Sequence, residues 1–282
     1  MKLVKQKLEF GKKKQTKLLA TSCWHLGSSA VSQKCIGKFI ERAKKHQWIH
    51  HGDMIEGITP NDRRFEAGSH TDTITECCTM ASEYILRARE TCVGLVLGNH
   101  EHTPSTEFGD LSQMIAAWGK VPYLSAVAFI DWKCPKGSFS HFVCHGNGSA
   151  NYRTGEPERR KINKKIKLRS ILDTFEADLK GMGHGHQSIS VGPCEEKKLC
   201  VVDGKLDRHP IVTRDSWAYM APSMFKTYNE KVEQTNYAEL KIFPANDIGW
   251  IEVVVNDNGT IDRILECNEN GEVVEETVRT IV

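Results

Sequence analysis

Apolar and polar residues alternate along the first two thirds of the chain in two different rhythms. Amphipathic stretches carry apolar side chains at the i, i+3, i+4 spacing of a helix, and the short apolar runs between them are typical of strands. The helical stretches are the one after Ser32, whose hydroxyl can cap it, and Thr71–Glu90, Leu111–Trp118 and Glu158–Phe175. The predicted strands are Leu3–Phe10, Lys17–Cys23, Trp48–His51, Val93–Leu97, Tyr123–Trp132, Phe139–Cys144 and, as a strand or turn, Leu179–Gly183.

Two of these predictions are specific enough to be checked individually. The turn-like Gly11-Lys12-Lys13-Lys14 lies between the first two strands and predicts that they form a hairpin. The helix over Glu158–Phe175 is expected to turn its apolar stripe inward. That stripe consists of Ile162, Ile166, Leu168, Ile171, Leu172 and Phe175.

Strands dominate the last third of the chain. The predicted pieces are Ser188–Val191, Lys198–Val202, Ile211–Tyr219, Tyr237–Ile242 and Trp250–Val255. This order of elements is typical of a layered α/β protein, most simply a four-layer α/β/β/α sandwich of two mixed β-sheets flanked by helices. No repeat or low-complexity linker divides the sequence, so we expect one domain over residues 1–282, with Thr59–His70 as its least patterned loop.

Composition narrows the class of protein. A chain of 282 residues with 39% hydrophobic and 26% charged residues is ordinary for a globular protein and too apolar for wholesale disorder. The apolar runs, such as Val93–Leu97, fall far short of the roughly 20 residues of a membrane span, and no secretory signal is visible. The ten cysteines form no C-x-x-C pair, so most are expected to be reduced thiols of a cytoplasmic protein without a membrane partner.

Chemically capable side chains gather where the predicted strands end. In open α/β sheets ligands bind beyond the carboxyl ends of the strands, so residues that follow five different strands can converge on one place. Glycines such as Gly52 and Gly98 stand beside nearly all of these residues and let the backbone turn sharply. The residues concerned are Cys23, His25, Asp53, Asn99, His100, His145, His184 and His186.

These residue types suit a site with two metal ions. Histidine, aspartate and a side-chain amide are good ligands for zinc, manganese or iron, and a carboxylate such as Asp53 can bridge two ions. Two ions about 3.5–4 Å apart clamp a phosphoryl group and activate water. His100 stands one residue beyond a ligand and would then face the substrate as a general acid. The expected cofactors are therefore two divalent metal ions.

The ordered blocks resemble the signature of the calcineurin-like metallophosphoesterase superfamily, which is D-x-H, G-D, G-N-H-[ED], H and G-H-x-H. Four of the five blocks are intact: Gly52-Asp53, Gly98-Asn99-His100-Glu101, His145 and Gly183-His184-Gly185-His186. The resemblance implies a metal-dependent phosphoesterase in which His100 assists the leaving group. It also implies two metal sites, the first held by His25, Asp53 and His186 and the second by Asp53, Asn99, His145 and His184.

The first block departs from the family because Cys23 stands where the family has aspartate. One hypothesis is that Cys23 supplies a thiolate to the first metal, which would favour zinc or iron over manganese or magnesium. The other is that Cys23 is a buried thiol and that the first site is weak or empty.

Several features bear on the substrate. The second block lacks the G-D-x-x-D-R-G pattern of protein phosphatases, whereas Trp24-His25-Leu26-Gly27 looks more like the nuclease and phosphodiesterase branches, including phage-encoded members. Basic residues crowd the helix after Glu158, and Arg153 follows His145 closely enough to pair with phosphate. We therefore rank phosphodiesters of nucleic acid or nucleotides first, then phosphomonoesters, then phosphoproteins. An inactive binding module with this fold is the alternative, and solvated basic faces are the alternative for the lysines and arginines.

The other histidines are expected to be surface or satisfied core residues, although His50 or His51 could support the site from behind Asp53. This set consists of His46, His50, His51, His70, His102, His141 and His209.

Overall fold

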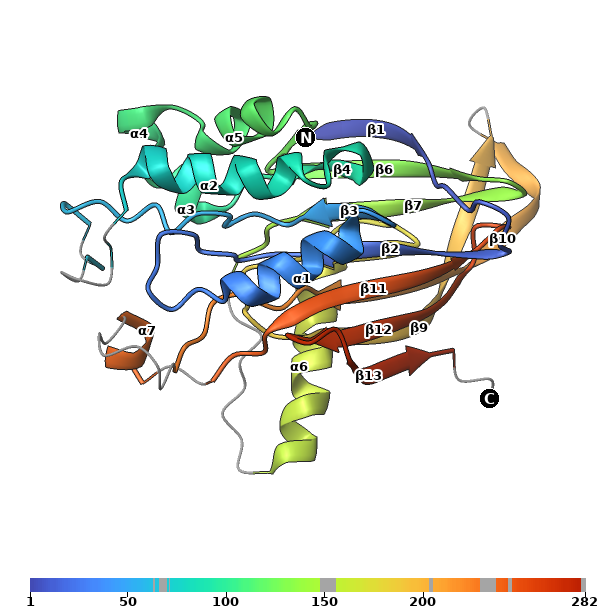
Figure 1. The fold of residues 1–282 in the computed structure, drawn as a ribbon. Helices are drawn as coiled ribbons and strands as arrows, with labels where there is room; N and C mark the ends of the chain where they lie inside the picture. The colour runs from blue at the N-terminus through green and yellow to red at the C-terminus, as the bar shows by residue number, and fades with distance from the viewer. Residues whose placement is uncertain are drawn as a thin grey trace.

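The computed structural model describes residues 1–62, 64, 65, 70, 72–147, 156–202, 205–228, 237–242 and 245–279, with only the backbone for 195–202, 205–214 and 237–238. Its strands form two mixed sheets (Figure 1). The six-stranded sheet has the order β1 (Lys2–Lys7), β6 (Val127–Cys134), β7 (Gly137–Cys144), β8 (Leu179–Met182), β10 (Lys205–Met220) and β9 (Ile189–Val202). The seven-stranded sheet has the order β13 (Val273–Val278), β12 (Ile261–Asn268), β11 (Gly249–Asn256), β2 (Gln15–Thr21), β3 (Gln47–His50), β4 (Cys92–Val96) and β5 (Tyr123–Ser125).

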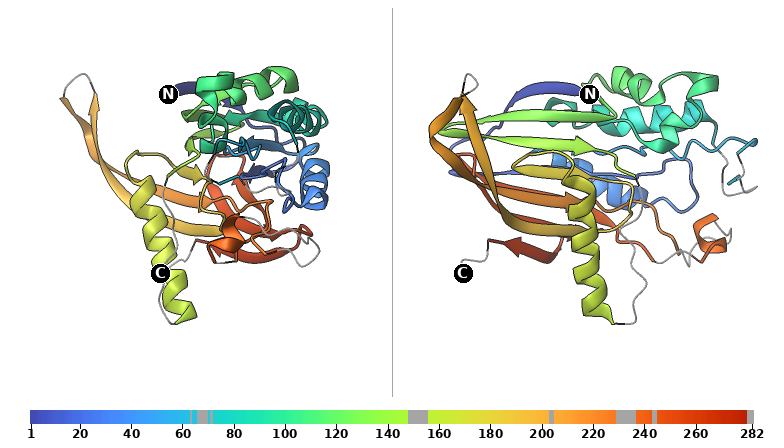
Figure 2. Two further views of the ribbon diagram at one scale, coloured as in Figure 1. Left: turned by 90° about the vertical axis from the view of Figure 1, so that its left-hand side faces the viewer. Right: turned by 180° about the vertical axis from the view of Figure 1, so that it is seen from behind.

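Helices cover the outer face of each sheet (Figure 2). The longer ones on the seven-stranded sheet are α1 (Gln33–Ala43), α2 (Ile74–Leu86) and α5 (Leu111–Gly119), and α6 (Pro157–Leu172) packs on the six-stranded sheet. The shorter helical elements are η1 (Arg89–Thr91), α3 (Asn99–His102), α4 (Ser105–Phe108) and α7 (Tyr237–Leu240). None of the described helices is long and apolar enough to cross a membrane.

Three apolar clusters define the layers. Phe39 of α1 and Trp48 of β3 belong to the cluster between the helices and the seven-stranded sheet. A second cluster lies between the two sheets, where Ile49 and Val143 are fully buried. The third joins Leu168 of α6 to the outer face of the six-stranded sheet. The predicted four-layer α/β/β/α sandwich is thereby confirmed.

Local sequence signals begin the helices that cover the seven-stranded sheet. The Ser32 hydroxyl accepts a hydrogen bond from the Cys35 amide at 3.4 Å and caps α1, as expected. At α2, Thr73 and Glu76 bond each other's backbone amides in a capping box. Strands β2, β3 and β4 run parallel, so their carboxyl ends lie at one edge of the sheet.

The predicted N-terminal hairpin is wrong. Strand β1 pairs in parallel with β6 in one sheet, whereas β2 pairs with β3 and β11 in the other. The connecting segment crosses between the sheets and buries Leu8 and Phe10 in the central cluster. The burial of these two side chains between the sheets favours the crossing, and a local turn pattern carries no information about it.

Other predictions in the last third need correction. The predicted pieces Ser188–Val191 and Lys198–Val202 belong to one strand, β9. Tyr237–Ile242 was expected as a strand, but the structure has helix α7 there. Strands β12 and β13 add to the edge of the seven-stranded sheet without having been predicted.

The inward apolar stripe of α6 is only partly confirmed. Leu168 and Leu172 are buried, but Ile162 and Ile166 are 57% and 62% exposed and Phe175 is 39% exposed. Ile162 is exposed because the first half of α6 projects beyond the sheet on which its second half packs, and Phe175 lies beyond the helix, which ends at Leu172 (Figures 1 and 2).

Candidate metal centre

The predicted metal ligands converge at the carboxyl ends of five strands, as expected. They follow β2, β3, β4, β7 and β8, and they form two groups that share Asp53. A third group of possible ligand atoms brings His25 together with Glu56 and His100. In the first group the ligand atoms of Cys23, His25, Asp53 and His186 lie within 4.8 Å of one another. In the second group the same holds for Asp53, His145 and His184.

The backbone at this edge is strained. Left-handed φ angles occur at five candidate ligands, namely Cys23 (50°), His25 (52°), Asp53 (59°), His184 (63°) and His186 (53°). Such a conformation costs a non-glycine residue roughly 1–2 kcal/mol. Neighbouring glycines permit the close approach: a Cβ on Gly52 would lie 2.7 Å from the Gly98 Cα and 2.8 Å from the His145 Nδ1. Strain concentrated in this way is typical of functional sites.

In the first group, the rings of His25 and His186 face each other through their Nε2 atoms. Their Nε2 atoms are 3.0 Å apart, and the His25 Nδ1 lies 2.8 Å from a carboxylate oxygen of Glu56. With its Nδ1 facing the Glu56 carboxylate, His25 offers its Nε2 as a ligand atom. Burial opposes protonation of His25, but Glu56, Cys23 and Asp53 together outweigh it and hold the His25 pKa well above its usual range.

In the second group, three donor atoms of different residues meet. The Asn99 Oδ1 lies 2.9 Å from the His145 Nε2 and 2.8 Å from the His184 Nδ1, and these two nitrogens are 3.1 Å apart. The His145 Nδ1 donates to the carbonyl of His51 at 2.6 Å, which leaves the Nε2 as ligand atom. Burial lowers the His145 pKa, but the Asp53 carboxylate more than compensates and raises it to about 9.

Asp53 lies between the groups and is placed to bridge two ions. One of its oxygens accepts from the His100 amide at 2.9 Å, and the other lies 3.0 Å from the His145 Nε2. Burial favours the neutral carboxyl, yet the positive charge of His145 and its hydrogen bond to the carboxylate do most to hold the Asp53 pKa well below its usual range.

Glu101 braces the loop that carries Asp53. Its buried carboxylate accepts hydrogen bonds from the amides of Asp53, Met54, Ile55 and Gly98 at 3.0, 2.5, 3.0 and 3.1 Å. Burial, reinforced by the charge of Asp53, raises the Glu101 pKa to about 7. Its place at the third residue of α3, a capping position, is the signal that reveals this role.

His100 lies against the first group without joining its ring of ligand atoms. Its ring is 4.6 Å from that of His25, and its Nδ1 donates to the Glu56 carbonyl at 2.5 Å. The His100 Nε2 is therefore the atom left to act on a substrate, and the Arg64 Nη1 donates to it at 3.3 Å. Glu56 and Arg64 were missed because only tertiary contacts connect them to the signature blocks. Arg153, the predicted phosphate partner, lies outside the described residues.

The donor set suits divalent transition metals. Imidazole nitrogens, a carboxylate and an amide oxygen are ligands of zinc, iron and manganese, and the thiol of Cys23 would add a soft donor. The His25 and His186 nitrogens are 3.0 Å apart and the His145 and His184 nitrogens 3.1 Å apart, too close for both members of either pair to carry a proton. Such spacing is expected of ligands that face one cation.

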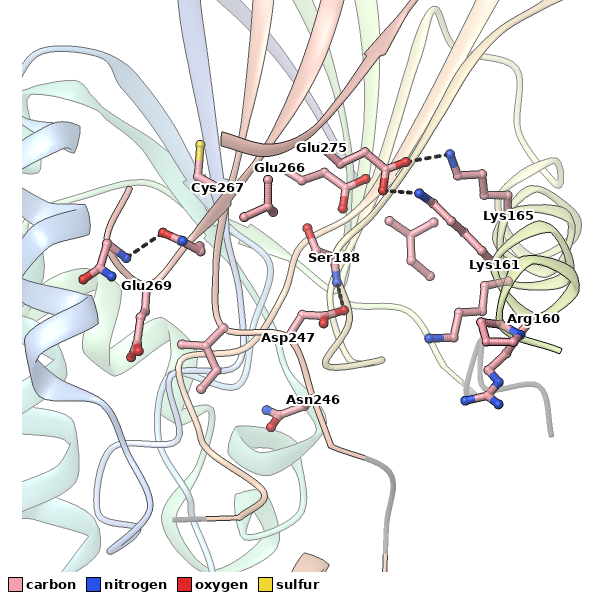
Figure 3. Close-up of a pocket in the computed structure, with 17 residues that line it drawn as sticks. Arg160, Lys161, Lys165, Ser188, Asn246, Asp247, Glu266, Cys267, Glu269 and Glu275 are labelled. Carbon is pink, nitrogen blue, oxygen red and sulfur yellow. Dashed lines mark hydrogen bonds and ion pairs between the residues drawn. The ribbon is translucent and has the colours of Figure 1, made fainter. Parts of the chain in front are cut away.

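A cavity of about 750 Å³ lies between α6 and the loop at residues 246–248 (Figure 3). Lys161 and Lys165 both pair with Glu275 there, at 2.8 and 3.0 Å. Arg160 and Lys164 also line it, and so do the acidic residues Asp247, Glu266 and Glu269. The cationic side chains come from α6 and the acidic ones from the elements opposite, so the charge of the cavity as a whole does not single out a polyanion (Figure 3).

Among known proteins, only solved structures are similar to this chain. No family model matches the chain, and no curated protein does. Yfce, a phosphoesterase from E. coli, overlaps 93% of this chain and 99% of its own at 12% identity, with a TM-score of 0.43. GAP50, the anchor in the inner membrane complex of Plasmodium, matches 96% of this chain and 90% of its own at 12% identity, with a TM-score of 0.44. The calcineurin-like phosphoesterase YfkN from Bacillus subtilis matches 93% of this chain and 89% of its own at 10% identity, with a TM-score of 0.37. Because the sequence identities and TM-scores are this low, the functional argument rests on the side chains of the site instead.

Proposed function

We propose that this protein is a metal-dependent phosphoesterase of the calcineurin-like metallophosphoesterase superfamily. One observation supports this above all: the donors of the ordered sequence blocks meet in two groups that share Asp53. A carboxylate between two groups of imidazole donors is the arrangement that a two-metal hydrolytic centre needs.

In this proposal Cys23, His25, Asp53 and His186 hold one ion, and Asp53, Asn99, His145 and His184 hold the other. When bound, two divalent cations supply the Lewis acidity that activates water and neutralises charge on a phosphoryl group. Glu56 and the His51 carbonyl fix the rings of His25 and His145, so that each presents its Nε2 to the centre.

His100 is the proposed proton donor to the leaving group. The Glu56 carbonyl holds the His100 Nδ1–H, so that the ring presents its Nε2 to the substrate. Burial lowers the His100 pKa, while Asp53 partly restores it, so the free ring is neutral near pH 7. The ring would take up a proton from solvent on Nε2 and deliver it to the departing oxygen.

Cys23 is proposed as a thiolate ligand, with zinc or iron preferred over manganese at the first site. Its fully buried side chain contributes Sγ to the first group, only 3.1 Å from the Ser22 hydroxyl. Cys23→Ser should lose metal from one site, and Cys23→Asp should bind manganese better than the native chain does. Unchanged metal content in Cys23→Ser would refute the thiolate.

A phosphodiester of nucleic acid or a nucleotide is the proposed substrate. Glu56-Gly57 stands where protein phosphatases of the superfamily have Asp-Arg, which argues against phosphoproteins. The exposed first half of α6 carries Arg159 and Arg160 and offers positive charge to a polyanion. Part of that helix serves structure instead, since Lys161 and Lys165 pair with Glu275.

The test is hydrolysis of bis-p-nitrophenyl phosphate beside p-nitrophenyl phosphate, with manganese, zinc, iron(II) or no added metal. We expect metal-dependent turnover with the diester preferred, and at least a hundredfold loss in His100→Ala with metal content unchanged. Preference for the monoester would redirect the proposal to phosphomonoesters. A folded, metal-loaded protein without turnover would favour a binding module.

A further inference from the structure

An arginine outside every signature block reaches the proposed reaction centre. Arg64 lies in the loop after the second block, and its Nη1 donates to the His100 Nε2 at 3.3 Å. His100 in turn contacts the shared carboxylate of Asp53 through its amide. Arg64 is thus two contacts away from the residue that joins both metal groups, and its side chain is 19% exposed.

Asp62 holds this guanidinium in place along one edge. Its carboxylate accepts from the Arg64 Nε at 3.0 Å and Nη2 at 2.7 Å, and also from the Arg64 backbone amide at 2.9 Å. These bonds lower the Asp62 pKa to about 2, so the pair stays ionised at neutral pH. Because Asp62 occupies the Nε–Nη2 edge, Nη1 is the nitrogen left to face the centre.

We infer that Arg64 is a substrate-binding residue whose Nη1 transfers from the His100 Nε2 to a non-bridging oxygen of the bound phosphoryl group. This inference rests on the proposed function, since it needs a phosphate ester in that centre. The transfer also releases the His100 Nε2 for the leaving group, so one movement serves both residues.

The ligand class follows from the chemistry of the contact. A planar guanidinium fixed by a carboxylate is organised in advance to donate to a tetrahedral oxyanion, at little entropic cost. A phosphate monoester or inorganic phosphate carries more charge on its free oxygens than a diester does. Loss of Arg64 should therefore weaken binding of the more highly charged ligand most.

The experiment measures binding of inorganic phosphate to the metal-loaded protein by titration calorimetry, for the native chain, Arg64→Gln and Arg64→Lys. Arg87→Gln is the matched control, because Arg87 is exposed and pairs with Glu41 on the surface. We expect the dissociation constant to rise about 10- to 100-fold in Arg64→Gln, as loss of a charged hydrogen bond implies, and to recover partly in Arg64→Lys. Arg87→Gln should bind as the native chain does.

Further outcomes separate the explanations. Added guanidinium ion should restore part of the phosphate affinity of Arg64→Gln, which a merely structural arginine would not allow. Native-like phosphate binding by Arg64→Gln, or loss of metal from it, would overturn the role given to Arg64. If the native, metal-loaded chain binds no phosphate and hydrolyses neither test ester, the proposed function itself fails, and this inference fails with it.

Discussion

Replacement of Glu56 by glutamine tests whether contacts behind the ligands tune the first metal site. The carboxylate lies 2.8 Å from the His25 Nδ1 and 3.6 Å from the His70 Nε2, and it is 12% exposed. Glutamine keeps the shape and can still accept a hydrogen bond, but it removes the charge. Loss of a carboxylate that supports a ligating histidine typically lowers metal affinity about 10- to 100-fold, and we expect a fall of that size at the first site.

The assay is competitive zinc titration against a chromophoric chelator, which resolves two binding steps. The step assigned to the first site should weaken in Glu56→Gln, while the step assigned to His145 and His184 should stay within threefold of native. Glu90→Gln is the control, since Glu90 is exposed and pairs with Arg89 on the surface. Two unchanged steps in Glu56→Gln would refute the reasoning about His25.

Three further predictions concern pH and backbone strain. The folded-state pKa of His145 is raised from 6.5 to about 9, so its pairing with Asp53 should stabilise the metal-free protein by about 3 kcal/mol below pH 6.5. This stabilisation is lost as the pH rises towards 9. Thermal unfolding of chelator-treated protein measures it, and a melting temperature that does not fall over that interval would contradict it. Metal must displace that same proton, so affinity at the second site should rise about tenfold per pH unit over the same interval, as metal titrations at several pH values would show. Gly52→Ala should destabilise the protein by about 2–5 kcal/mol in urea unfolding. Gly11 also has a positive φ but open space around it, so Gly11→Ala should cost only about 1–2 kcal/mol. Equal costs for the two variants would show that crowding at Gly52 is unimportant.

The ligands could be predicted from the sequence because each one directly follows a short apolar strand. Parallel strands end at a common edge, so Asp53 after β3 and Asn99 after β4 had to lie near each other once the strands paired. The four-layer architecture followed from the same alternation of strands and helices. These predictions needed only local patterns and one topological rule.

The residues that support the ligands could not be predicted in this way. Glu56 and Arg64 act through contacts that form only after the loops have packed, whereas His51 was proposed as support and contacts His145 through its carbonyl. The chain crossing at Leu8 and Phe10 also depends on the second sheet, and the exposure of Ile162 depends on how far α6 extends past its sheet. The predicted cytoplasmic location, single domain and role of Arg153 stay predictions.

The central claim is that Asp53 joins two metal sites, and the metal content of Asp53→Asn tests it most directly. After equilibration with zinc or iron and removal of free ion, the native chain should retain two ions per molecule by elemental mass spectrometry. Asp53→Asn should lose both, together with hydrolysis of bis-p-nitrophenyl phosphate, while its far-ultraviolet circular dichroism stays native. Two retained ions in folded Asp53→Asn, or none in the native chain, would contradict the account.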